Sequence, residues 1–158
     1  MNPRVWSTLF RFVLALWVGG VAAVTFVVTP PIFASFPRDE AGRVVGVLFP
    51  VYFPYVTALV AAALVLYLFG RRGPWSTPHR VAVGLLVTAL LAAGANQFWV
   101  HPRARAVKAE IHSFENLAPD HPLRRRFGRL HGVSMALNLL VLAEGAFLLL
   151  GDRRWFGA

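Results

Sequence analysis

The sequence contains no cysteine among its 158 residues. This absence excludes disulfides, thiolate nucleophiles, iron–sulfur clusters and zinc sites built on cysteine. Motifs of soluble enzymes are missing as well: there is no nucleophile elbow, P-loop, dinucleotide fingerprint or pair of zinc-binding histidines on a helix. The sequence therefore does not favour an enzyme.

Charged residues are scarce, at 15% of the chain, whereas soluble domains carry about 25%. Hydrophobic residues make up 57% and fall in long blocks with the charges between them, which is typical of membrane proteins. The net charge is +9. We interpret this excess as basic residues that hold helix ends at lipid head groups, because no spacing typical of nucleic-acid binding accompanies it. The lipid bilayer is thus the expected partner, and nucleic acid is not.

Four apolar blocks are long enough to cross a bilayer. They predict an all-α, polytopic membrane protein in which residues 1–158 form a single four-helix transmembrane domain. The predicted helices cover about residues 5–29, 51–69, 78–100 and 127–150. Pro30 and Pro31 are expected to end the first helix, because proline donates no hydrogen bond to the helix ladder. We further predict a short interfacial helix over 40–49 and a helical extramembrane segment over 103–114.

Four spans place both termini on the same side of the membrane. The connection between the second and third helices is short and purely basic, and short loops weigh most in the positive-inside rule. We therefore expect both termini in the cytoplasm, although the other side carries more basic residues in total. Ala15, Gly19 and Ala23 recur every four residues on the first helix. This stripe predicts the close approach of another helix, in the bundle, in a homo-oligomer or in a larger complex.

Polar side chains inside the predicted spans are costly in lipid, so their positions point to a site or to interhelical contacts. On a helical wheel His131 and Asn138 lie about 20° apart, with Ser134 beside them. Further polar residues lie at the same level on the neighbouring helices: Asn96, Gln97, Tyr52 and Tyr55. We predict that this set converges on a polar pocket or permeation path. Hydrogen bonds that only fix the packing are the alternative.

Two ionisable residues lie deeper in the predicted spans. Arg11 is about six residues inside the first helix, and Glu144 is about as far inside the end of the fourth. Because each is costly alone, we predict a structural ion pair between them. A proton-binding carboxylate at Glu144 is the alternative.

Histidine and methionine are ligands of copper and of haem iron. His131 and Met135 are four residues apart, so they share one helix face, and His101 is expected on the same side of the membrane. These three residues are the candidate ligands for copper or haem.

Several short motifs resemble a bacterial family related to eukaryotic transmembrane protein 205. They are Leu16-Trp17-Val18-Gly19-Gly20, Pro30-Pro31-Ile32-Phe33, Ala41-Gly42-Arg43, Leu48-Phe49-Pro50-Val51-Tyr52 and Phe127-Gly128-Arg129-Leu130-His131-Gly132-Val133-Ser134 with Asn138. The resemblance covers most of the chain and implies four helices in a bacterial inner membrane. The eukaryotic relative's link to platinum-drug tolerance implies handling of soft metals or a role in vesicle traffic. A looser likeness joins the first helix to the copper-resistance protein D group and to membrane-bound protoporphyrinogen oxidases. The oxidases' histidine in that helix is absent here, which argues against haem.

Three functions stay open. The first is a small transporter or metal-handling protein with a polar intramembrane pocket along His131 and Asn138. The second is a haem- or quinone-binding redox protein with His131 as ligand. The third is an accessory or assembly subunit without chemistry, which would use its small-residue stripes for partner contacts.

Overall fold

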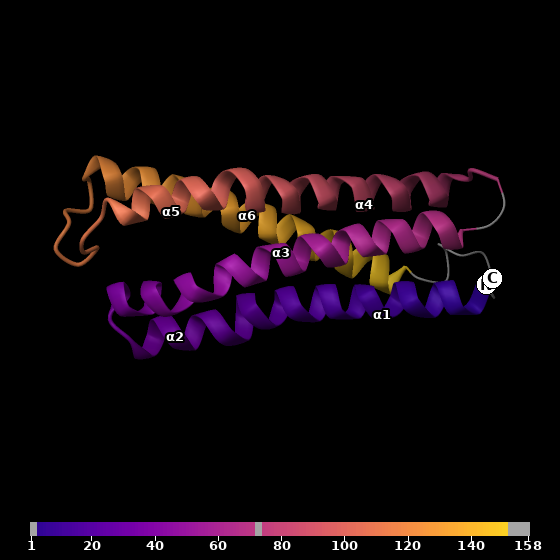
Figure 1. Ribbon diagram of the computed structural model, residues 1–158, viewed down its shortest axis with the longest axis horizontal. Coiled ribbons are helices and arrows are strands. Elements are labelled where there is room, and N and C mark those ends of the chain that lie inside the picture. Colours follow the sequence, from indigo (N-terminus) through magenta and orange to yellow (C-terminus); the bar gives the residue numbers. More distant parts are fainter. Residues whose placement is uncertain (1–2, 72–73, 152–158) are drawn as a thin grey trace.

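The computed structural model describes residues 3–71 and 74–151, and this part of the chain forms helices and no strand. Four of its helical stretches are long and apolar enough to cross a membrane: Arg4–Ser35, Arg38–Gly70, Thr77–Ala109 and Pro122–Leu150. The prediction of an all-α fold with four spans is confirmed, and these helices mark a membrane protein. The spans run up and down the bundle, so that the start of the first and the end of the last lie at the same end (Figure 1). We call this the terminal end, and the opposite one the loop end.

The first span continues past the predicted stop. It consists of α1 (Pro3–Ala22), a π-helical segment η1 (Ala23–Val28) and α2 (Thr29–Ser35). In η1 the backbone N–H of Thr29 bonds to the carbonyl of Val24, five residues back. Pro30 and Pro31 follow in the first turn of α2, where a missing amide donor costs little. The prediction that this proline pair ends the helix is therefore wrong.

The second span, α3 (Arg38–Gly70), is one helix of 33 residues. It absorbs residues 40–49, so the separate interfacial helix expected there is instead the first part of α3. Ala41 and Val45 are buried in this part, which gives it packing of its own. Pro50 and Pro54 lie inside the helix and do not begin it. Neighbouring helices make such interior prolines tolerable in membrane proteins.

The third span contains a second π-helical segment. It is built from α4 (Thr77–Ala95), η2 (Asn96–Val100) and α5 (His101–Ala109). The helical segment expected over 103–114 is therefore an extension of this span, and it ends at Ala109. The connection that follows, residues 110–121, is not helical but covers a small core of Val107, Ile111 and Phe114.

The fourth span, α6 (Pro122–Leu150), begins five residues before the predicted Phe127. Its start follows from local chemistry. Pro122 occupies the first turn, and the His121 Nδ1 atom accepts a hydrogen bond from the backbone N–H of Leu123 at 3.3 Å. This side-chain cap satisfies one of the amide groups that a helix start leaves open.

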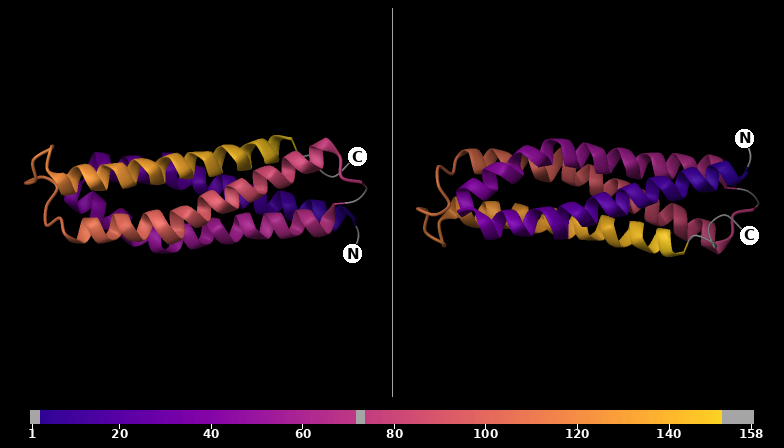
Figure 2. Two further views of the ribbon diagram at one scale, coloured as in Figure 1. Left: turned by 90° about the horizontal axis from the view of Figure 1, so that it is seen from above. Right: turned by 90° about the horizontal axis from the view of Figure 1, so that it is seen from below.

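The spans form a ring in which α1 packs against α3 and α6, and α4 packs against the same two helices (Figure 2). Fully buried apolar side chains fill the middle of the ring. On α1 these are Phe10, Leu14, Trp17 and Val21, at the spacing of three and four residues that gives one helix face. The small-residue stripe of the same helix is exposed, since Ala15, Gly19 and Ala23 lie on its outer side. It does not mediate packing within this bundle.

Candidate functional site: a cavity at the loop end

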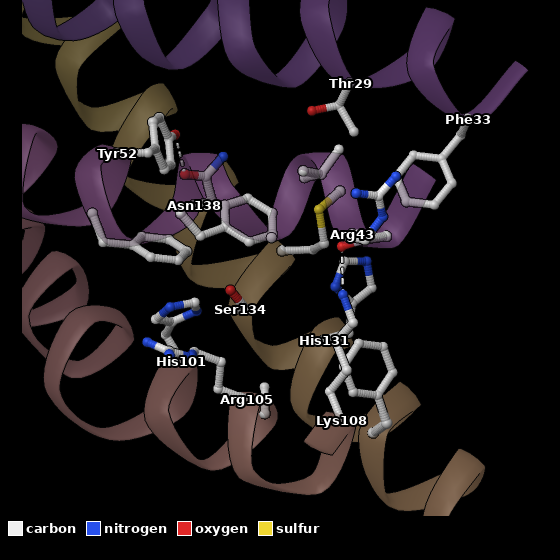
Figure 3. A pocket seen from close by; sticks show the side chains of 18 of the residues that line it. Thr29, Phe33, Arg43, Tyr52, His101, Arg105, Lys108, His131, Ser134 and Asn138 are labelled. Atoms are coloured by element: carbon white, nitrogen blue, oxygen red, sulfur yellow. Dashed lines mark hydrogen bonds between the residues drawn. The ribbon is translucent and has the colours of Figure 1, made fainter. Parts of the chain in front are cut away.

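A cavity of about 680 Å³ lies between the helices at the loop end. This volume falls within the range of about 300–1,000 Å³ that is typical of small-molecule sites. All four spans contribute to the lining, which is mostly apolar. Its polar and charged members are Thr25, Thr29, Arg38, Asp39, Arg43, Tyr52, His101, Arg105, Lys108, His131, Ser134 and Asn138. Figure 3 shows the Tyr52–Asn138 pair at one end of the cavity and Lys108, Arg43 and His131 at the other.

The inner end of the cavity is closed by a hydrogen-bonded chain across three spans. The Tyr52 hydroxyl donates to Asn138 Oδ1 at 2.6 Å (Figure 3). The Asn138 Nδ2 atom donates to Thr25 Oγ1 at 3.0 Å. One amide on α6 thus joins α3 and η1, and its oxygen and nitrogen are both satisfied. Buried polar groups need such partners in lipid.

A second polar pair lies one turn before Asn138 on α6, nearer the loop end. Ser134 Oγ donates to Asn96 Oδ1 at 2.8 Å, and Asn96 Nδ2 donates to the Ser134 carbonyl at 3.1 Å. Asn96 belongs to η2, as Thr25 belongs to η1. Since Ser134 and Asn138 are neighbours on one helix face, the two π-helical segments lie at about the same depth. Such π segments are frequent at functional sites.

The outer end of the cavity is basic. Arg43 and Lys108 lie at this end, whereas Arg105 lies nearer His101 (Figure 3). With Arg38 they make four cationic side chains in the lining of the cavity, against the carboxylate of Asp39. Arg43 also pairs with Glu40 at 3.6 Å. Lys108 crosses to α3, where its Nζ atom donates to the Gly42 carbonyl. A Cβ atom at Gly42 or Gly46 would lie 3.4 Å from that nitrogen. Because these two glycines have no side chain, the Lys108 ammonium group can lie directly against the backbone of α3.

The Asp39 carboxylate is occupied by the connection between α5 and α6. Its Oδ2 atom accepts from Ser113 Oγ at 2.6 Å, and its Oδ1 atom accepts from the Phe114 backbone N–H at 2.8 Å. Arg124 holds the same connection by donating to the carbonyls of Phe114 and Leu117, at 3.2 and 2.6 Å. Asp39 therefore fastens the loop beside the cavity, and the cationic groups keep an excess of positive charge.

Two histidines line the cavity in different surroundings. The His101 ring packs against Phe53 and Phe49, with centroid separations of 4.9 and 5.8 Å. Its Nε2 atom is buried without a hydrogen-bond partner. The His131 ring stacks on Phe127 at 6.0 Å. An orphaned buried nitrogen is uncommon in folded proteins and calls for an explanation.

Most of the predicted polar set lies at the cavity. Tyr52, Ser134, Asn138 and His131 line it, as do His101 and Met135, while Asn96 supports Ser134 from behind. Gln97 is not part of the lining, and its Oε1 atom is buried without a partner. Tyr55 lies elsewhere: it is 42% exposed and rests against Gly20 on α1. The α3 helix turns this side chain about 60° from Tyr52.

Glu144 has a different partner from the predicted one. Its Oε1 atom lies 2.5 Å from Thr88 Oγ1 on α4, and no Arg11–Glu144 ion pair occurs among the described residues. The cause is register. The next residue, Gly145, meets Trp17, which places Glu144 about 9 Å along the bundle from Arg11.

The basic lining and Thr25 were missed from the sequence. Arg38, Arg43, Arg105 and Lys108 were interpreted only as anchors at lipid head groups. A usable signal was present, because Gly42 and Gly46 form a small-xxx-small pattern that admits a close neighbour. Thr25 carries no such signal within its apolar run.

Among the described residues, no three His, Asp or Glu side chains gather as a metal site would require. The metal site at His131, Met135 and His101 stays a prediction. Four nearby cations would oppose a metal cation by repulsion.

Comparison with known proteins gives a family and a relative. The family described as "Domain of unknown function (DUF4149)" matches residues 12–113, from α1 into the connection after α5. An uncharacterized protein of Aquifex aeolicus (strain VF5) is 32% identical over 143 residues, which cover 89% of this chain and 93% of the relative. No solved structure matches the chain.

Proposed function

This chain belongs to the DUF4149 family, a bacterial family of unknown function, and from that premise we propose that it is a small membrane transporter whose cavity binds amphipathic organic anions. The single observation that carries the proposal is the cavity at the loop end, which joins an apolar interior to a cationic outer end. The likeness to the family of transmembrane protein 205 is part of the same proposal.

The charges of the cavity support an anion as ligand. Arg38, Arg43, Arg105 and Lys108 bring four positive charges to the cavity. Two carboxylates oppose them, since Asp39 is part of the lining and Glu40 pairs with Arg43, so the positive charge stays in excess. Like charges repel more strongly where water is displaced, and an anion offsets that repulsion. Arginine suits carboxylates, sulfonates and phosphates because its fork of N–H donors matches their oxygens.

The shape of the cavity supports a ligand with an apolar portion. From Asp39 to Tyr52 it follows α3 for about 20 Å. Phe49, Phe53 and Val45 line this length, and the hydrogen-bonded amide of Asn138 closes the inner end. A ligand would place its charged group among the basic residues and its chain against the aromatic ones.

Polar contacts beyond the cavity support transport over storage. The contact of the third span with α6 carries the Asn96–Ser134 pair behind the cavity and the Thr88–Glu144 pair closer to the terminal end. Thr88 on α4 and Asn96 at the start of η2 are eight residues, or about 12 Å, apart along the third span. The two pairs give a polar seam along two spans that otherwise face each other with apolar residues.

The test uses decanesulfonate, which stays negatively charged at any working pH, and decyltrimethylammonium as a cation of equal chain length. We expect calorimetry in nanodiscs to show binding of the sulfonate, and proteoliposomes to release it faster than protein-free vesicles. Arg105→Gln should weaken binding by about 10- to 150-fold, since a hydrogen bond to a charged group contributes about 1.5–3 kcal/mol.

Arg126→Gln is the matched control, because Arg126 is exposed at the same end and does not line the cavity. Equal binding of the anion and the cation, or an Arg105→Gln variant that binds like the control, would refute an anion site. Binding without release would leave a receptor and refute the transporter.

A haem-binding protein is the second candidate, favoured by the buried, unpartnered Nε2 of His101. The His101 side chain is part of the lining of a cavity whose basic residues suit the propionates of haem. Titration of the purified protein with haemin should then give a Soret band that His101→Gln abolishes. An unchanged haemin spectrum would reject this candidate.

A further inference from the structure

Glu144 is a carboxyl group inside the membrane that the proposed anion cavity does not use. It lies on α6, six residues before the end of that helix, and its exposed fraction is 7%. The neighbouring Gly145 packs directly against Trp17, which is fully buried on α1. The carboxyl is therefore enclosed by α1, α4 and α6.

The Thr88 hydroxyl has one hydrogen and three acceptors within reach. Thr88 Oγ1 lies 2.5 Å from Glu144 Oε1, 2.9 Å from the Gly84 carbonyl and 3.1 Å from the Leu85 carbonyl. A hydroxyl has one hydrogen, and backbone carbonyls only accept. Threonine in a helix commonly donates to the carbonyl four residues back. When it does so here, the hydrogen between Thr88 and Glu144 belongs to the carboxyl.

The second carboxyl oxygen supports the same protonation state. Glu144 Oε2 is buried without a hydrogen-bond partner. Among the described residues no basic side chain forms an ion pair with Glu144. An ionised carboxylate with one bare oxygen in a lipid-facing bundle is strongly disfavoured, whereas the neutral acid is tolerated.

Tyr55 on α3 lies against Gly20, three residues beyond Trp17 on α1, and the other titratable and charged groups nearest to Glu144 lie nearer the terminal end. On α1 the nearest is Arg11, about 9 Å along the bundle from the level of Glu144. On α4 they are His79 and Arg80, at least eight residues, or about 12 Å, before Thr88. On α3 Tyr67 lies close to His79, with its hydroxyl 2.7 Å from His79 Nδ1.

We propose that Glu144 is a proton-binding site within the membrane, whose carboxyl holds a proton against Thr88 and exchanges it with water at the terminal end. The Thr88–Glu144 pair is also part of the polar seam that supports transport, but neither residue lines the anion cavity, and the protonation of Glu144 needs no ligand there. It gives the protein a group through which a proton can enter the bundle between two spans.

The first test is labelling with dicyclohexylcarbodiimide, a lipid-soluble reagent that reacts with protonated carboxyls. The carboxyl oxygen adds to the central carbon of the reagent while the acid proton moves to a reagent nitrogen, and rearrangement leaves a stable acylurea. Peptide mass mapping of the wild-type protein in lipid should find the adduct on Glu144. Glu40 and Glu115 are exposed internal controls that should stay unlabelled. Equal labelling of all three would overturn the proposal.

The second test is infrared spectroscopy of the same preparation. The protonated carboxyl should give a C=O stretch that is lost in Glu144→Gln and displaced in Glu144→Asp. Transfer to D₂O should shift the band, which reports exchange of the proton. A wild-type spectrum without a protonated-carboxyl band overturns the site, and a band indifferent to D₂O overturns the exchange. Neither result depends on whether the cavity binds anions.

Discussion

At the scale of single residues, the side-chain amide of Asn138 holds together the helices at the inner end of the cavity. It accepts from Tyr52 on α3 and donates to Thr25 on η1, so one side chain joins three spans. Side chains that fasten helices in this way fix their relative rotation as well as their separation. The shape of the cavity therefore follows from hydrogen bonds at its closed end.

Tyr52→Phe should lower the free energy of unfolding by about 0.6 kcal/mol, with an upper bound of about 1.7 kcal/mol, the range for interhelical hydrogen bonds in membranes. The physical reason is that Asn138 Oδ1 loses its donor while the ring and its packing remain. Unfolding in mixed micelles measures the change. Tyr55→Phe is the control, because Tyr55 is 42% exposed and outside the cavity. Equal losses in both variants would contradict a role for the Tyr52–Asn138 bond.

Single residues also show how far the sequence could predict the site. The stripe of His131, Ser134 and Asn138 could be placed because a helix of known period fixes which side chains share a face. Thr25 could not, since a threonine in an apolar run has the same pattern whether it bonds to its own helix or to a neighbour. The cationic residues of the cavity lining were not predicted for a different reason. Arg105 and Lys108 follow the predicted third span, residues 78–100, as anchoring residues do. Only the tertiary structure shows that they lie on a continuation of that span beside α3.

At the scale of the helix, contacts between spans depend on how closely two backbones approach. Gly145 on α6 is such a point. A Cβ atom there would lie 2.9 Å from Trp17 Cε2 and 3.0 Å from Val18 Cγ2. Trp17 is fully buried, so its ring has no free space into which to move. The absence of a side chain at Gly145 is what allows α1 and α6 to pack.

Gly145→Ala should therefore destabilise the protein by about 1–3 kcal/mol, the usual cost of overpacking. Thermal unfolding in detergent, followed by fluorescence, measures the effect. Gly132→Ala on the same helix is the matched control, because nothing lies within 4 Å of its added Cβ. There we expect no loss, since alanine is a better helix former than glycine. A Gly145→Ala protein as stable as the control would refute tight packing against Trp17.

The extent of the helices was harder to predict than their existence. The apolar blocks identified four spans, because lipid leaves few alternatives for a backbone that must satisfy its own hydrogen bonds. The prediction at Pro30 was wrong because proline normally stops a helix. Here the π-helical hydrogen bonds of η1 run to the carbonyl five residues back, and Pro30 then lies in the first turn of α2, where it needs no amide donor. The predicted second helix likewise began too late, at residue 51, because residues 38–49 include polar side chains. In the structure these residues are the first part of α3, which packs against neighbouring segments.

The molecule as a whole places its two kinds of connection at opposite ends. The end of α3 and the start of α4 lie at the terminal end, and the turn from α2 to α3 lies at the loop end with residues 110–121 (Figure 2). Since the sequence has no cysteine, single cysteines can report sidedness against a blank background.

We expect a membrane-impermeant maleimide to label Asn116→Cys in intact cells and Ser76→Cys only after permeabilisation. Both positions are exposed, and they lie at opposite ends of the bundle. This result would follow if the basic α3–α4 connection stays in the cytoplasm. The reverse pattern would place the termini outside, and labelling of both residues in intact cells would contradict the four-span arrangement.

The π-helical segment η2 has a consequence for how this protein can vary. It carries one residue more than an α-helix would hold in the same turn. Loss of one residue there would leave an ordinary α-helical turn, so α5 would keep its rotation relative to α4. His101, Arg105 and Lys108 would stay at the cavity together, because they share one rigid helix. The length of the chain can thus change by one residue in this turn while the face that α5 turns toward the cavity stays the same.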